Sequence, residues 1–145
     1  MPYEYRGDIA AADIAFNAWG STLVELFTDA ARATLQVMME DPNEIRPSVK
    51  VDVELEQGSE EMLLFDFLNE LIFYKDARRL FLLPARLAIT ATATGKGFKV
   101  TGVLEGEQIE PKRHRVQTDV KAVTMLRFSL EKVDTGWRST VVLDV

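Results

Sequence analysis

Three acidic groups in this sequence could share a metal ion. An apolar, β-branched run ends on Asp144 and Val145, so a strand predicted to reach the last residue would hold both the Asp144 side chain and the terminal carboxylate in place. Asp13 is the third group and stands in the otherwise apolar segment 9–16. Fixed anions at close range repel each other unless a cation lies between them, and carboxylate oxygens suit Ca²⁺ or Mg²⁺. Asp8 is a further candidate ligand.

This site requires the first and last strands to be neighbours, because Asp13 and Asp144 lie far apart in the sequence. The alternative interpretation is structural, with Asp13 at a strand start and Asp144 as a solvated chain end. Lys121 lies among apolar residues at a predicted strand start, where it could pair with the acidic cluster or simply face solvent.

The histidine, His114, falls in a basic stretch with Lys112, Arg113 and Arg115. Without a second histidine or a cysteine it is a poor zinc ligand, and we expect it to be solvated. The stretch predicts a local positive patch together with Lys121.

Composition excludes several classes of function. The chain of 145 residues contains no cysteine, which removes disulfides, thiolate metal sites and cysteine nucleophiles. The sequence shows no Gly-x-Ser-x-Gly element, phosphate-binding loop or dinucleotide fingerprint. The net charge of −6 argues against strong direct binding of nucleic acid. No apolar stretch reaches the roughly 18 residues that span a bilayer, and no signal region opens the chain, so we expect a cytoplasmic protein.

The elements that must position these residues follow from periodicity. Alternation predicts strands over 14–19 and 49–55, and helical spacing predicts helices over about 22–39, capped by Ser21, and 60–74, capped by Ser59. The second helix is apolar on most sides, so we expect it to be covered on more than one side. From Leu80 onward the pattern is β, ending in a predicted hairpin of 120–133 and 137–145.

This order predicts an α+β fold, with mainly antiparallel β layers and two helices packed on one side. Helices too few to connect every strand in parallel favour antiparallel pairing. Length and the absence of a linker predict a single domain over residues 1–145.

The sequence also resembles a known family at four places in order. These are the N-terminal segments 3–5, 12–14 and 18–27 (Ala-Trp-Gly-Ser-Thr-Leu-Val-Glu-Leu-Phe), the helix 63–73 (Leu-Leu-Phe-Asp-Phe-Leu-Asn-Glu-Leu-Ile-Phe), the segment 120–124 (Val-Lys-Ala-Val-Thr) and the ending Leu143-Asp144-Val145. They are similar to the corresponding motifs of the archease family.

The resemblance implies an accessory protein of the GTP-dependent, RtcB-type RNA-splicing ligase, which joins tRNA halves and repairs RNA. The resemblance implies a non-enzymatic protein that promotes guanylylation and multiple turnover of that ligase, with a fold that combines β layers with a layer of helices. The resemblance implies a divalent metal at an acidic tip formed by Asp13 and Asp144 with the Val145 terminus close by. The family lysine corresponds to Lys121, a charge partner or a contact to the ligase.

The chain departs from the family pattern beside the predicted site. Ala10 and Ala11 stand where the family has His and Thr, so Asp8 could be a displaced acid after an insertion. Met125 and Leu126 replace an aromatic and a polar residue. One alternative is therefore a divergent, chaperone-like interaction module that keeps the fold without the metal. A metal-dependent enzyme is a further alternative, for which the sequence offers no evident general base.

Overall fold

The computed structural model describes residues 2–6 and 13–145. Within these residues the chain forms two antiparallel sheets and a small set of helices. Their order is β1 (Tyr3–Arg6), β2 (Asp13–Gly20), α1 (Leu23–Met38), a 3₁₀ turn (Pro42–Glu44), β3 (Val49–Gln57), α2 (Glu60–Arg78), β4 (Leu80–Ala91), β5 (Phe98–Gln108), α3 (Pro111–His114), β6 (Ala122–Val133) and β7 (Gly136–Asp144).

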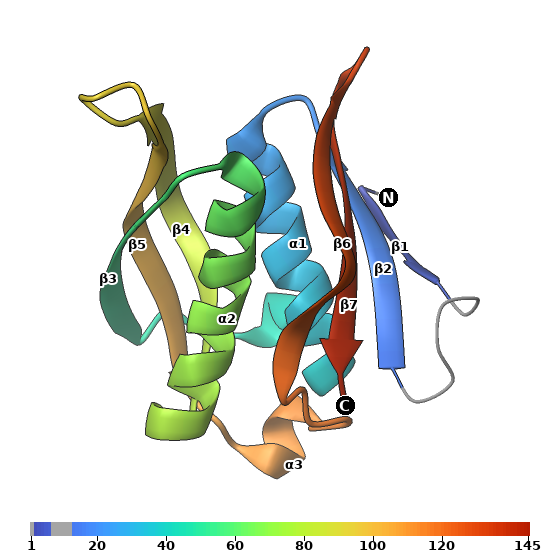
Figure 1. Ribbon diagram of the computed structural model, residues 1–145. Coiled ribbons are helices and arrows are strands. Elements are labelled where there is room, and N and C mark those ends of the chain that lie inside the picture. Colours follow the sequence, from blue (N-terminus) through green and yellow to red (C-terminus); the bar gives the residue numbers. More distant parts are fainter. Residues whose placement is uncertain (1, 7–12) are drawn as a thin grey trace.

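The long helices α1 and α2 form a layer between the two sheets (Figure 1). The four-stranded sheet has the order β1-β2-β7-β6, and the three-stranded sheet has the order β3-β5-β4. Each sheet therefore carries the helices on one of its sides only. The predicted α+β class, with antiparallel β layers and helices packed on one side, is confirmed.

The helices begin where side chains satisfy their free amide groups. Thr22, rather than the predicted Ser21, caps α1, because its hydroxyl accepts from the amide of Glu25 at 3.2 Å. The Glu25 carboxylate in turn accepts from the amide of Ser21 at 2.8 Å. Ser59 caps α2 as predicted, by accepting from the amide of Met62.

Helix α2 lies between both sheets because it is apolar on more than one side. Its buried residues include Leu63 and Phe67, and it contacts β3, β4 and β5 as well as β6. The prediction that this helix is covered on more than one side is confirmed. The helix extends to Arg78, one turn beyond the predicted end, and Arg79 ends it in the left-handed conformation.

Three features of the strands could be seen only in the structure. Residues Tyr3–Arg6, for which the sequence pattern predicted no element, form the edge strand β1. β4 runs through Pro84 as one strand with a local irregularity in register. β5 continues through Gly106 to Gln108, and Gly106 lies against the backbone of β4.

The core fills the space between the sheets. The largest fully buried side chains come from the helices and from strands of both sheets, among them Phe16, Phe27, Phe67 and Phe81. In the described part of the chain, no helix is long and apolar enough to cross a membrane.

Candidate functional site

Asp13 and Asp144 are direct partners across two adjacent strands. Asp13 is the first residue of β2 and Asp144 the last residue of β7, and the two strands pair in antiparallel register with these residues opposite each other. Pairing continues from Ile14 with Leu143 to Gly20 with Trp137. The structure thus places the two distant aspartates side by side, as the predicted joint site requires.

Both carboxylates project from the outer face of the four-stranded sheet. Phe16 of β2 and Val141 and Leu143 of β7 belong to the core between the sheets. Because side chains alternate along a strand, Asp13 and Asp144 point to the opposite face, where both are half-buried. Residues directly opposite in an antiparallel pair have Cβ atoms roughly 4.5–5.5 Å apart, and like charges at that distance destabilise the sheet.

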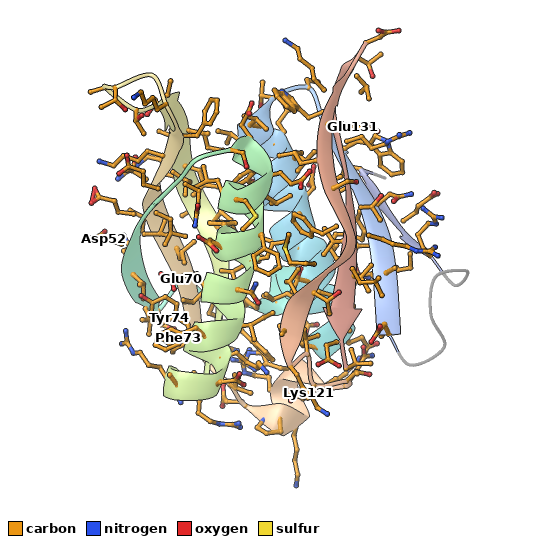
Figure 2. All side chains as sticks on the ribbon, in the orientation of Figure 1. Asp52, Glu70, Phe73, Tyr74, Lys121 and Glu131 are labelled. Atoms are coloured by element: carbon orange, nitrogen blue, oxygen red, sulfur yellow. The ribbon has the colours of Figure 1, made fainter. Side chains whose placement is uncertain are left out.

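Lys121 lies at the same end of the molecule. Its backbone amide donates to the carbonyl oxygen of Asp144 at 2.8 Å, and the next residue, Ala122, pairs with Asp144. The Lys121 side chain is exposed and is seen beside the chain end in Figure 2. Within residues 2–6 and 13–145 it forms no ion pair, so its charge is available to a partner.

The described residues supply two acidic side chains to this tip. Val145 is half-buried and its side chain packs against the core, which holds the chain end beside Asp144. Asp8 lies outside the described residues. Among those that are described, no group of three or more His, Cys, Asp or Glu is placed to hold a metal ion. The donor set, two carboxylates and a neighbouring chain end, is all oxygen and fits Mg²⁺ or Ca²⁺ in kind.

A buried lysine that the sequence reasoning missed lies close behind the tip. Lys75 of α2 is only 7% exposed, and its ammonium group donates to Asp119 Oδ1 at 2.6 Å and to the Val120 carbonyl at 2.7 Å. Helical spacing was the available signal. Lys75 follows Leu71 by one turn and therefore lies on the buried face of α2.

The predicted positive patch is smaller than its sequence suggests. Arg113 forms ion pairs with Glu107 and Glu110, and Arg115 pairs with Glu40 at 3.0 Å. Acidic neighbours thus neutralise the two arginines, which leaves Lys112 and Lys121 as its remaining cations.

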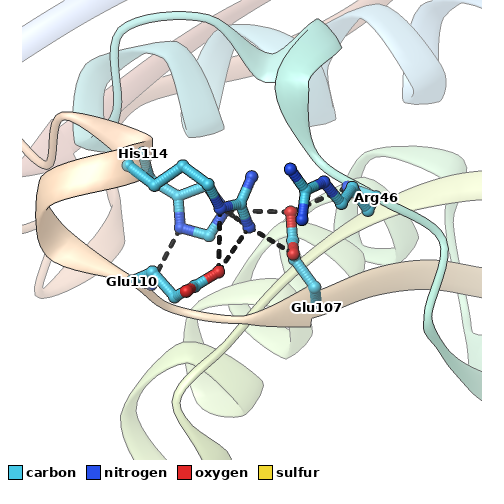
Figure 3. A network of polar contacts seen from close by, with 5 residues as sticks. Arg46, Glu107, Glu110 and His114 are labelled. Atoms are coloured by element: carbon cyan, nitrogen blue, oxygen red, sulfur yellow. Dashed lines mark hydrogen bonds and ion pairs between the residues drawn. The ribbon is translucent and has the colours of Figure 1, made fainter.

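His114 is buried, contrary to the expectation that it is solvated. It ends the short helix α3 and is fully excluded from solvent, with its ring edge against Phe81 at 5.5 Å between centroids. Its Nδ1 accepts from the amide of Glu110 at 2.9 Å, which places the ring proton on Nε2. Nε2 then donates to Glu107 Oε2 at 3.0 Å (Figure 3).

Glu107 is the centre of this network. Its buried carboxylate also accepts from Arg113 and from the backbone amide of Arg46, the latter at 2.8 Å (Figure 3). Burial alone raises the pKa of Glu107, but the hydrogen bonds from Arg113, His114 and the Arg46 amide outweigh it and lower the pKa to about 2. The network joins β5, α3 and the segment before β3. It therefore holds α3 in place, and from α3 the chain runs on to Lys121.

The lowered pKa of Glu107 predicts that the protein becomes less stable in acid. A pKa lowered from 4.5 to about 2 stabilises the fold at pH values above 4.5, and this contribution disappears as the pH falls towards 2. We expect it to amount to about 3 kcal/mol of the free energy of unfolding. Urea unfolding at pH 7, 5, 4 and 3 of the wild type and of Glu107→Gln measures it. The difference between the two proteins should shrink towards low pH, and a constant difference would contradict the assignment.

Comparisons with known proteins agree over almost the whole chain. A family model described as the Archease protein family matches residues 3–145. The chain is 34% identical over 143 residues to Protein archease of Methanosarcina acetivorans, covering 99% of this chain and 95% of that protein. It is 33% identical over 134 residues to Protein archease of Methanopyrus kandleri, covering 92% and 94%.

Solved structures give the same result for the fold. The solution structure of protein 1598 of Methanobacterium thermoautotrophicum superimposes with a TM-score of 0.82 at 30% identity and covers 99% of both chains. A crystal structure from Thermotoga maritima, described as an archease and possible chaperone, covers 98% of both chains with a TM-score of 0.56 at 24% identity. The second likeness concerns the fold alone.

Proposed function

This chain belongs to the archease family, and we propose from this premise that it is an accessory protein of an RtcB-type RNA-splicing ligase. In this role it promotes guanylylation and multiple turnover of the ligase during tRNA splicing or RNA repair, and it is not itself the enzyme. A divalent metal, Ca²⁺ or Mg²⁺, is held at the tip by Asp13 and Asp144, with the Val145 carboxylate and Asp8 as further predicted donors.

The observation that carries the proposal is the direct opposition of Asp13 and Asp144. Two like charges at cross-strand distance destabilise a sheet, and a shared cation converts that repulsion into attraction. When bound, the metal supplies a concentrated positive charge at this end of the sheet. Lys121 adds a second cation at the same end, as a charge partner of the acidic groups or a contact to the ligase.

Substitution of either aspartate tests whether the two carboxylates bind a metal or are merely structural. We expect Asp13→Asn and Asp144→Asn to abolish stabilisation by Ca²⁺ or Mg²⁺, which is about 2.7 kcal/mol in the wild type at 100 times the dissociation constant. In the absence of metal the same variants should be as stable as the wild type or more stable, because a like-charge pair is removed. Thermal unfolding with EDTA and with each metal measures both effects.

Asp134→Asn is the matched control, since Asp134 is an exposed aspartate in the turn at the opposite end of the β6–β7 hairpin. It should behave as the wild type in every condition. If either tip variant retains the full metal response, Asp13 and Asp144 are not the ligands.

The role in RNA ligation is tested by turnover. Multiple rounds of ligation by an RtcB-type ligase should increase when the wild-type protein is added, and much less with the two tip variants. Equal turnover with and without the wild-type protein would refute the proposed partner. Ligation or phosphoester cleavage by the isolated protein would instead favour an enzyme.

One observation favours a second candidate, a chaperone-like interaction module without a metal. The described residues place only two acidic side chains at the tip, and no third His, Cys, Asp or Glu joins them. This candidate predicts that neither Ca²⁺ nor Mg²⁺ changes the unfolding temperature of the wild type, while stimulation of the ligase survives in Asp13→Asn and Asp144→Asn.

A further inference from the structure

Lys75 is a buried cation with three oxygen atoms close to its ammonium group. It lies in the last turn of α2, and its ammonium group contacts Asp119 Oδ1 at 2.6 Å, the Val120 carbonyl oxygen at 2.7 Å and Asp76 Oδ1 at 2.7 Å. A buried ammonium group is costly unless it is paired and hydrogen-bonded, and here two hydrogen bonds and the ion pair with Asp76 offset that cost. Both hydrogen-bond acceptors belong to one short segment, residues 119 and 120, which leads into β6.

That segment carries the residues of the tip. Val120, which is held by Lys75, is followed directly by Lys121, and the Lys121 amide donates to the Asp144 carbonyl at 2.8 Å. Asp144 in turn stands opposite Asp13. A continuous series of contacts therefore runs from the end of α2, through the backbone of 119–121, to the pair of aspartates.

The rest of this segment is held by the buried side chain of Val120 and, on its N-terminal side, by backbone hydrogen bonds. The preceding residues are tied to the end of α1, because the Gln117 amide donates to the Met38 carbonyl at 2.8 Å and the Thr118 amide to the Val37 carbonyl at 3.3 Å. These backbone bonds end at Thr118. At Asp119 and Val120 the chain is instead hydrogen-bonded to the ammonium group of Lys75.

We propose that Lys75 is a positioning residue for the tip. It fixes the backbone of 119–121 so that Lys121 and Asp144 keep their place beside Asp13. The importance of this role for metal binding and for the ligase rests on the proposed function, whereas the positioning itself does not.

Hydrogen exchange of the full-length protein, followed by NMR, tests the positioning directly. Lys75→Met keeps the length and apolar stem of the side chain but removes its three donors. We expect exchange of the Lys121 amide to accelerate at least tenfold more than exchange of amides in the β3–β5 ladder, which lies in the other sheet. A uniform loss of stability would accelerate both alike and would overturn the proposal.

Two variants of Asp119 serve as a matched pair. Asp119→Glu keeps a carboxylate for Lys75 and should leave exchange at Lys121 within about twofold of the wild type. Asp119→Ala removes that acceptor and should accelerate exchange at Lys121, but less than Lys75→Met, because the bond to the Val120 carbonyl remains. Equal exchange at Lys121 in the wild type and in Lys75→Met would refute the proposal.

Calorimetric titration with Ca²⁺ and Mg²⁺ tests the consequence for the tip. Residues that orient metal ligands typically change affinity by roughly 10–100-fold, so the dissociation constant should rise at least tenfold in Lys75→Met and stay unchanged in Asp119→Glu. Unchanged affinity in Lys75→Met would overturn the positioning of the site. If the wild type binds neither metal, the metal part of the proposed function fails, and exchange at Lys121 alone decides the role of Lys75.

Discussion

Glu107→Gln is expected to lower the free energy of unfolding at pH 7 by about 3 kcal/mol, in the range for breaking a buried ion pair by removing one partner. The Glu107 carboxylate accepts from Arg113, from His114 Nε2 and from the Arg46 amide. A glutamine amide group brings two donors to a place where only donors converge, so at least one buried donor loses its partner. Urea unfolding at pH 7 measures the change.

Glu110→Gln provides the control for this variant. Glu110 pairs with the same arginine, Arg113, but its side chain is 57% exposed, against 8% for Glu107. We expect a loss of less than about 1 kcal/mol, as for other exposed pairs. If both substitutions lower the free energy of unfolding by the same amount, burial is not the reason that the Glu107 network stabilises the fold.

Gly106→Ala is expected to destabilise the protein by more than about 4 kcal/mol, in the exceptional range for a single substitution. A Cβ atom at residue 106 would lie 1.8 Å from the carbonyl oxygen of Phe81, so β4 and β5 would have to separate. Backbone, unlike a flexible side chain, cannot yield to such a contact. Circular dichroism and thermal unfolding measure the loss of folded protein.

Gly58→Ala is the matched control, because an added Cβ there meets no atom within 4 Å. Its free energy of unfolding should stay within about 0.5 kcal/mol of the wild type, as for most surface changes. A stable Gly106→Ala protein with an intact three-stranded sheet would contradict the close approach of β4 and β5.

The elements with strong periodicity could be predicted from the sequence. Alternation along β3 and the apolar surface of α2 correctly indicated a strand and a helix covered on more than one side. β1 could not be predicted, because four residues are too few to establish a period and the strand depends on pairing with β2. The path of β5 through Gly106 depends likewise on contact with β4.

The residues of the site that lie at strand ends could be predicted from the sequence. The buried polar residues near it could not. The pairing of the first and last predicted strands brought Asp13 and Asp144 together. Lys75 was missed, and the expectation that His114 is solvated was wrong, because a lysine or histidine is buried only when tertiary structure supplies its partners. Neither Asp119 nor Glu107 is adjacent to its partner in the sequence. The metal-ligand role of Asp13, Asp144, Val145 and Asp8 stays a prediction.

The order of strands in the four-stranded sheet has a consequence for biosynthesis. β7, the last described strand to leave the ribosome, lies between β2 and β6 and is hydrogen-bonded to both. Until it emerges, the hairpin of β1 and β2 has no connection to β6, and the inner edge of β2 stays open. An open strand edge on a nascent chain can pair with other chains, so this sheet closes late and the edge of β2 is exposed to such pairing until β7 is in place.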